Sequence, residues 1–306
     1  MMTNRIKSSI PLVLLLSIIW GCERFLEVEL PGQEPRLVMN SLLENSDTIR
    51  VYLTKSRGIL EGREYDGFEY VKGGKVFLKN ESGAIFPFAF IDKSNPIESF
   101  AYYYLAGYDF KDNERYEILA ESEGFKPISG EVQFPEPIAI KEISYRNLGP
   151  VESFTSQDLL EFTVKFDDLP GKNFYELKGR FYGPSTTQAN SFYSGDLYPR
   201  PVNPAYQRDS WTYSGLLFDD VLLSGKDSEI VFRSTFPRDY DLEVTINLSH
   251  VSESYYRYEE TVGLQNYNRG DFLSQPVLVY TNIKNGMGIL KARNTDTKIL
   301  KILLEE

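Results

Sequence analysis

Short runs of alternating apolar and polar residues, separated by turn-forming residues, recur through most of the chain after residue 35. Residues 36–42 and 48–54 are rich in β-branched, aromatic and aliphatic side chains, and Asn45, Ser46 and Asp47 separate them. Alternation over runs of this length is typical of β-strands. Further strands are predicted at residues 75–79, 102–105, 116–120, 159–166, 174–182, 230–233 and 242–248. The pattern therefore predicts an all-β fold.

Two local signals follow in the last quarter of the chain. Ser252 is suited to cap one short helix whose first turn holds Glu253. Asn285-Gly286 is a pair favoured in turns that need positive φ at both central residues, which predicts a hairpin. The helix would place Tyr255, Tyr258, Val262 and Gln265 on one face, the hairpin would join residues 277–283 to 287–292, and residues 297–304 would add a last strand.

Prolines mark the predicted division between two domains. Pro135 and Pro137 each lack a backbone donor and fix φ, which suits a strand end or linker. We place the boundary between residues 136 and 137. Residues 36–136 are then predicted to form a β-sandwich, and residues 137–306 a second β-sandwich or barrel-like domain.

The first 21 residues have the composition of a secretory leader. Arg5 and Lys7 precede an apolar run at residues 10–20, and Gly21 follows. The run is about half the roughly 20 residues that a permanent transmembrane helix needs. We expect cleavage after residue 21 rather than a retained span.

Cys22 is the single cysteine of the chain. Residues 19–22 resemble a bacterial lipobox, although Trp20 is bulkier than is usual there. The resemblance implies cleavage before Cys22 and a lipid on its thiol, with acyl chains such as palmitate holding the protein at the membrane. Residues 22–35 would form a tether. The alternative is that Cys22 merely follows an ordinary secretory cleavage site.

The charge balance excludes one class of partner. The net charge is −11, and loss of Arg5 and Lys7 with the leader makes it more negative by two. Nucleic-acid binding depends on neutralisation of phosphates by Lys and Arg, so we expect no nucleic-acid partner. Anionic lipid headgroups would not attract the chain either.

Residues that could support catalysis or hold a metal are few. His250 is the sole histidine and is predicted to lie at a strand end before the helix cap. Zinc usually takes several Cys or His ligands, which this chain does not supply. Calcium needs only oxygen ligands, so it stays open. The densest acidic pairs, Asp167-Asp168 and Asp219-Asp220, stand beside turn signals and are predicted to be solvated turns.

No other pattern singles out a reaction. With 44 acidic residues, some pair will meet a glycosidase separation by chance, so the sequence identifies none. Gly286-x-Gly288 lies inside the predicted hairpin and lacks a third glycine, so it carries no nucleotide signal. We predict no catalytic residue, no metal site and no cofactor.

An aromatic segment is the strongest candidate for ligand contact. Four prolines interrupt residues 183–214, which predicts a long loop, and loops of this length are often functional. Tyrosine and tryptophan stack on sugar faces and are common in binding hot spots. The candidate ligand-binding residues are Tyr193, Tyr198, Tyr206, Trp211 and Tyr213.

Several stretches together resemble the Bacteroidota lipoproteins grouped as domain-of-unknown-function family 4249. The stretches are residues 22–31, 36–40, 218–226, 255–258 and 280–289. Residues 73–78 through 116–125 are similar to the carboxypeptidase-regulatory type of immunoglobulin-like sandwich. The resemblance implies an outer-membrane lipoprotein, often encoded near TonB-dependent receptors, and it implies no active site.

These observations favour a non-enzymatic accessory protein of the outer membrane that binds a glycan or peptide, or a TonB-dependent receptor, during nutrient uptake. Two alternatives remain open. One is a carboxylate- or calcium-dependent hydrolase of extracellular polymers, and the other is a structural or adhesive surface module. The sequence is compatible with the periplasmic and with the surface face of that membrane.

Overall fold

The structure is a computed structural model of the 306-residue chain. It describes residues 34–58, 68–92, 100–151, 154–207, 215–223, 225–268, 275 and 277–302. The predicted leader (residues 1–21) and Cys22 lie outside the described residues, as does all but the end of the predicted tether at residues 22–35.

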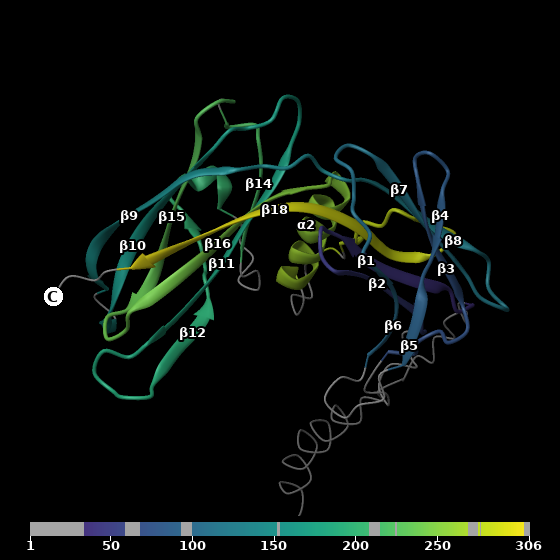
Figure 1. Ribbon diagram of the computed structural model, residues 1–306, viewed down its shortest axis with the longest axis horizontal. Helices are drawn as coiled ribbons and strands as arrows, with labels where there is room; N and C mark the ends of the chain where they lie inside the picture. Colours follow the sequence, from purple (N-terminus) through teal and green to yellow (C-terminus); the bar gives the residue numbers. More distant parts are fainter. Residues whose placement is uncertain are drawn as a thin grey trace, which may run out of the picture. The chain divides into compact units, whose positions relative to one another are not determined.

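The described residues form three β-sheets, which confirms the all-β prediction (Figure 1). The nine-stranded sheet runs β12 (Phe192–Asp196), β11 (Phe174–Pro184), β16 (Leu242–Val251), β18 (Met287–Ile302), β1 (Leu37–Leu43), β2 (Thr48–Lys55), β6 (Ala101–Ala106), β5 (Ala89–Asp92), with β14 (Gly215–Asp219) also on β11. The four-stranded sheet runs β13 (Arg200–Pro201), β15 (Ser228–Pro237), β10 (Phe154–Phe166), β9 (Ile140–Val151). The five-stranded sheet runs β17 (Ile283–Lys284), β8 (Ile128–Gln133), β7 (Arg115–Glu121), β3 (Lys75–Asn80), β4 (Ile85–Pro87).

Two hydrophobic cores lie against the nine-stranded sheet. Strands β1, β2 and β6 share the first core with β3, β7 and β8, where Met39 and Ile118 are fully buried. Strands β11 and β16 share the second core with β10 and β15, where Phe162 and Phe232 stack at 5.2 Å. The packing is sandwich-like in both. The proposed boundary at residues 136 and 137 falls between β8 and β9.

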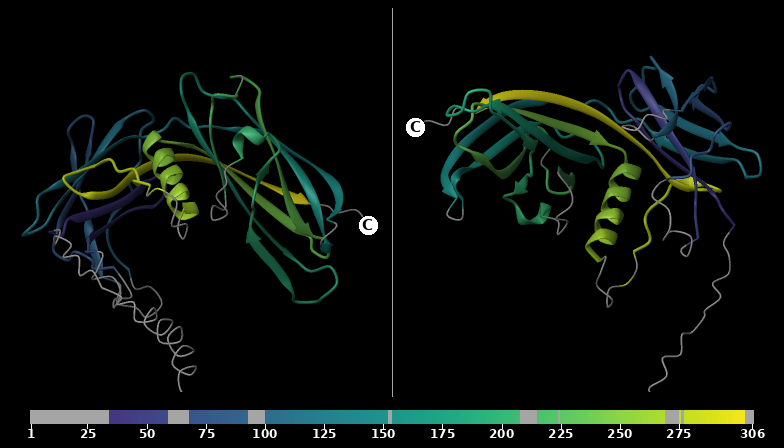
Figure 2. Two further views of the ribbon diagram at one scale, coloured as in Figure 1. Left: turned by 180° about the vertical axis from the view of Figure 1, so that it is seen from behind. Right: turned by 90° about the horizontal axis from the view of Figure 1, so that it is seen from below.

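Strand β18 contributes to both cores and corrects one prediction. The sequence suggested separate strands at residues 287–292 and 297–304, whereas β18 runs without a break from Met287 to Ile302 (yellow in Figures 1 and 2). Its first part pairs in parallel with β1 and its second part antiparallel with β16. The partner changes along the strand, so no turn is needed between the two parts.

The predicted hairpin around Asn285-Gly286 is wrong. Strand β17 pairs with β8 in the five-stranded sheet, while β18 pairs with β1 and β16 in the nine-stranded sheet. Asn285 does have a positive φ of 60°. A Cβ on Gly286 would come within 2.8 Å of the Leu37 carbonyl oxygen. The turn is therefore real, but it carries the chain from one sheet to another.

The helix prediction is confirmed. Helix α2 spans Glu253–Asn268, and the Ser252 hydroxyl accepts a hydrogen bond from the Tyr255 amide at 3.2 Å. Tyr255 and Tyr256 are buried against the nine-stranded sheet, where Tyr256 lies 4.5 Å from the Phe174 ring. No helix in the described ranges is both long and apolar enough to cross a bilayer.

The segment predicted as a loop at residues 183–214 is more ordered than expected over its described part. It contains the edge strand β12, the two-residue strand β13 and a single 3-10 turn, η2, at Pro204–Tyr206. Prolines at strand edges do not prevent pairing when their missing donor faces away from the partner. The proline count therefore overstated how irregular this segment is.

Candidate ligand-binding surface

Strands β11 and β12 form a hairpin at one edge of the nine-stranded sheet (Figure 1). They pair antiparallel, with Arg180 opposite Asp196 and Gly183 opposite Tyr193. The far side of β12 pairs with no strand among the described residues. Side chains on this hairpin are therefore placed at a rim of the sheet, where a partner can reach them.

Two aromatic pairs lie on opposite faces of this hairpin. Phe181 and Tyr193 stack at 5.4 Å with their planes 11° apart, and Phe181 is buried in the second core. Tyr182 and Phe192 stack at 5.6 Å with their planes 9° apart. Their exposed fractions are 55% and 58%. The second pair therefore exposes much of two stacked aromatic rings to solvent.

Glycine at one position permits this arrangement. A Cβ on Gly195 would lie 2.7 Å from the Phe181 ring, which is too close for a real contact. Phe181 therefore covers the backbone of β12 directly, and alternation then turns Tyr182 to the opposite face.

Of the five predicted residues, two are exposed near this rim. Tyr193 stacks on the buried Phe181 but is itself 37% exposed, and its ring lies 5.2 Å from the Tyr240 ring. Tyr198 is 58% exposed. It follows Leu197, which is buried and donates from its amide to the Gly179 carbonyl oxygen at 2.8 Å.

Tyr206 has a different setting. It ends η2 and packs edge-on against Phe218 at 5.6 Å in the second core. Burial raises the pKa of its hydroxyl, and the carboxylate of Asp219 raises it further. A cavity of about 250 Å³ lies beside it, with Val221 and Leu222 on its lining. Tyr206 is thus mainly a packing residue.

Trp211 and Tyr213 lie outside the described residues. Tyr182 and Phe192 are exposed residues that the sequence analysis did not single out. The signal that could have found them is the doubled aromatic pattern, Phe181-Tyr182 and Phe192-Tyr193, on either side of residues 183–191. Such doublets stack across a hairpin when the register brings them together.

The two acidic pairs lie at the ends of β10 and β14 and are half-buried, not solvated as predicted, and one member of each pair stabilises the same turn region. Asp168 accepts the Tyr175 hydroxyl at 2.7 Å, and Asp220 accepts the Asn173 amide at 2.6 Å. Burial raises the pKa of Asp168, and nearby Asp220 adds to the rise. Asp167 instead forms an ion pair with Lys141 at 2.5 Å. Each carboxylate has a structural hydrogen-bonding or ion-pairing partner.

His250 occupies the predicted place near the end of β16. Its Nδ1 donates to the Glu136 carbonyl oxygen at 2.9 Å, and its ring lies 5.5 Å from Tyr175. Burial lowers the pKa of His250 despite this hydrogen bond. The described residues bring together no three Asp, Glu, His or Cys side chains in a geometry that could hold a metal ion.

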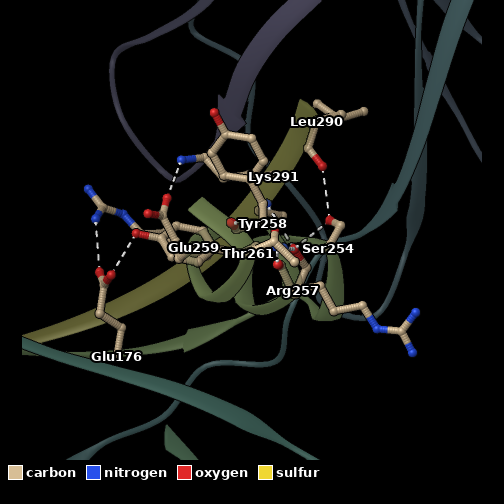
Figure 3. Close-up of polar contacts among 12 residues, drawn as sticks. Glu176, Ser254, Arg257, Tyr258, Glu259, Thr261, Leu290 and Lys291 are labelled. Atoms are coloured by element: carbon tan, nitrogen blue, oxygen red, sulfur yellow. Dashed lines mark hydrogen bonds and ion pairs between the residues drawn. The ribbon is translucent and has the colours of Figure 1, made fainter. Parts of the chain in front are cut away.

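A buried charged cluster between helix α2 and the nine-stranded sheet was not predicted (Figure 3). At its centre Glu176 of β11 is 1% exposed and accepts the Tyr255 hydroxyl at 2.7 Å. Lys178 lies 3.0 Å from the same carboxylate. Arg293 of β18 lies 3.6 Å from its other oxygen and 2.7 Å from Glu44.

The cluster continues along the helix. Lys291 forms an ion pair with Glu259 at 2.8 Å, and its ammonium lies over the rings of Tyr255 and Tyr258 (Figure 3). Burial and the Glu176 carboxylate raise the pKa of Tyr255, so its hydroxyl stays protonated and donates. The contacts join α2 to two strands, which indicates a structural role.

Comparison with known proteins gives one family. A family model described as a domain of unknown function (DUF4249) matches residues 23–299. No curated protein matches the chain. Among solved structures, the chain is similar to the pullulanase from Anoxybacillus sp. LM18-11 complexed with maltotriose, at 9% identity and a TM-score of 0.21. The match covers 68% of this chain and 24% of that one.

Proposed function

We propose that this chain, which belongs to the family described as a domain of unknown function (DUF4249), is a lipid-anchored binding protein of the bacterial outer membrane. In this proposal it is not an enzyme, and it works alongside a TonB-dependent transporter in nutrient uptake. Its anchor would be an acylated Cys22. Residues 36–136 would be an immunoglobulin-like sandwich of the carboxypeptidase-regulatory type, and the source would be a member of the Bacteroidota.

The observation that carries this proposal is the exposed pair formed by Tyr182 and Phe192 at the rim of the nine-stranded sheet. The two rings stack on each other, and more than half of each side chain is left uncovered by the rest of the described chain. Contiguous exposed aromatic surface is costly to solubility and commonly marks a binding site. Rings of this kind contribute strongly when they stack on a flat partner such as a sugar.

The leader and the lone cysteine support the anchoring part of the proposal. The chain has a basic start, a short apolar run and Gly21-Cys22. Because anchoring by acyl chains needs no basic surface, it also suits a chain with a net charge of −11.

The test of binding uses the lipidated protein in neutral detergent micelles. We expect a double variant, Tyr182→Ala with Phe192→Ala, to lose at least about tenfold in affinity for a bound polysaccharide or an identified TonB-dependent receptor. The matched control is Phe68→Ala, because Phe68 is 68% exposed and lies elsewhere in the sequence. Equal loss in both variants, or no receptor and no polysaccharide bound by the wild-type protein, would contradict the proposal.

The anchoring step has its own test. Mass spectrometry of protein isolated from membranes should show an acylated N-terminal Cys22, and Cys22→Ser should move the protein out of the membrane fraction. A bare thiol or an uncleaved leader would rule out the lipid anchor.

A further inference from the structure

Four charged residues form one line across the four-stranded sheet. In the strand register, Arg200 of β13 lies opposite Arg233 of β15, Arg233 lies opposite Glu161 of β10, and Glu161 lies opposite Arg146 of β9. Cross-strand partners in this register point to the same face of a sheet, with neighbouring strands about 4.8 Å apart. We name these four residues the arginine row.

The arginine row lies on the outer face of the sheet. The adjacent line of partners, Phe232 with Phe162 and Tyr145, packs into the second core. Alternation then points the arginine row away from that core. The Arg146 and Arg233 side chains are 67% and 44% exposed, and Arg200 is exposed as well.

The three arginines of the row carry more positive charge than the single carboxylate of Glu161 can neutralise. One Glu161 oxygen accepts from Arg146 at 2.6 Å and the other accepts from Arg233 at 2.9 Å. Both carboxylate oxygens of Glu161 are therefore engaged by other arginines. Arg200 makes no ion pair with any residue that the structure describes. The row is left with a surplus of two positive charges in a chain whose net charge is −11.

Neighbouring lines of the sheet do not offset this surplus. On one side the partners Val231, Thr163 and Ser144 are uncharged, and on the other side Leu159 pairs with Thr235. Like charges directly opposite each other destabilise a sheet. The repulsion between Arg200 and Arg233 is thus an unfavourable term that no described neighbour offsets. An anion bound between the two guanidinium groups would remove this repulsion.

An exposed aromatic ring lies next to this position along the chain. Tyr198 and Arg200 are exposed, while Pro199 between them is buried. The two exposed side chains are only two residues apart in the chain, so one ligand can reach both. A sugar acid offers both a ring face for the tyrosine and a planar carboxylate for bidentate binding by arginine.

We propose that the arginine row binds the carboxylates of an acidic polysaccharide, with the first carboxylate held between Arg200 and Arg233. The inference rests on the proposed binding function and names its ligand class. An acidic peptide or an anionic lipid surface would share the charge but would not need the Tyr198 ring.

The experiment measures affinity of the lipidated full chain, in neutral detergent micelles, for polygalacturonate and for its methyl ester. The ester keeps the sugar backbone and removes the charge. We expect wild-type protein to bind the acid form, to bind the ester at least about tenfold more weakly, and to lose affinity for the acid form as salt rises. Arg200→Gln should weaken binding of the acid form by at least about tenfold, and Arg200→Lys by less.

The matched control is Arg257→Gln on helix α2, because Arg257 is 52% exposed and its contacts, an ion pair with Glu253 and a position over the Tyr280 ring at 5.6 Å, lie away from the arginine row. It should bind like the wild type. Circular dichroism of each variant checks that the fold is kept.

Three outcomes would overturn the inference. If the ester binds as tightly as the acid and both depend on Tyr182 and Phe192, the binding function stands and the arginine row is not its site. If only polyglutamate or phosphatidylglycerol vesicles bind in an Arg200-dependent way, the polysaccharide class is wrong. If neither polygalacturonate nor these two probes bind, the arginine row is not an anion site. This holds whether or not the protein binds a TonB-dependent receptor.

Discussion

The arginine row and the buried cluster at Glu176 differ in their charge balance and in their exposure to solvent. The buried cluster contains three acids and three bases, joined by ion pairs and through the Tyr255 side chain: Glu44, Glu176, Glu259, Lys178, Lys291 and Arg293. The arginine row contains one acid for three arginines. The first group has equal positive and negative charge around the buried Glu176, whereas the second has a surplus of positive charge on an exposed face.

The difference follows from the medium around each group. A buried charge without a partner costs several kcal/mol, so the cluster around Glu176 has to be neutral overall. At an exposed sheet face, water and salt screen a surplus charge, and its cost falls to tenths of a kcal/mol. A charge cluster that is neutral overall therefore indicates a structural role. A surplus of charge on an exposed face costs little, and a charged ligand can bind to it.

The largest expected effect comes from breaking the balanced cluster. Arg293→Met should lower the free energy of unfolding by about 3 kcal/mol, because it leaves the buried Glu176 and its neighbour Glu44 short of a cation. Urea denaturation of the variant measures this loss. Arg257→Met on the same helix should cost only about 0.4 kcal/mol, since its pair with Glu253 is exposed. Similar losses in both variants would contradict the special role of the cluster.

Removal of one hydroxyl should have a smaller effect. Tyr255→Phe deletes the donor to Glu176 and should cost about 2 kcal/mol, as expected for a buried hydrogen bond to a charged acceptor. The control is Tyr182→Phe, whose hydroxyl is on an exposed residue and should change the free energy of unfolding by less than about 0.5 kcal/mol. Thermal and urea unfolding should rank the two variants in this order.

Removal of the single acid of the arginine row should depend on pH. Burial acts to raise the pKa of Glu161, but hydrogen bonds from Arg233 and Arg146 outweigh it and hold the pKa below 4.5. A lowered folded-state pKa means that the carboxylate stabilises the fold above about pH 4.5 and loses this effect as the pH falls through the folded-state value.

Glu161→Gln should therefore lower the free energy of unfolding by about 1 kcal/mol at pH 7. The gap from wild type should narrow in acid, below the folded-state pKa. Unfolding free energies measured from pH 7 down to pH 3 check this trend. A gap of constant size at all pH values would show that charge is not the cause.

The smallest expected change in the free energy of unfolding has opposite signs for Arg200 and Arg146, the two ends of the arginine row. Arg200→Gln should raise the free energy of unfolding by about 0.5 kcal/mol, because it relieves the repulsion from Arg233. Arg146→Gln should lower it by a similar amount, since Arg146 pairs with Glu161. The comparison is made at low salt, where both effects are largest. Destabilisation by Arg200→Gln would mean that its charge is compensated in the free protein.

Local patterns predicted several of the strands and the helix, because those elements leave a local signature. Alternation at residues 36–42 and 48–54 corresponds to β1 and β2, and Ser252 caps α2 as expected. Strand β9 was missed because its side chains are mostly exposed, so its apolar residues do not alternate. The Asn285-Gly286 turn was found, but which strands it joins depends on pairing across sheets.

The candidate site was only partly predictable for the same reason. The density of aromatic residues led to Tyr193 and Tyr198, but Tyr182 and Phe192 meet only through the β11–β12 register. The arginine row draws its members from four strands that are distant in sequence. The pairing of these strands cannot be predicted from a local sequence pattern. The surplus of positive charge is therefore found only once the sheet is known.

Hydrogen exchange of the lipidated protein with polygalacturonate shows directly whether the arginine row binds carboxylates. We expect slower exchange of the Arg200 amide in β13 and of the amides in the facing part of β15 with the acid form, and no slowing there with the methyl ester. Equal protection by both polymers, or protection confined to segments away from Arg200 and Arg233, would contradict it.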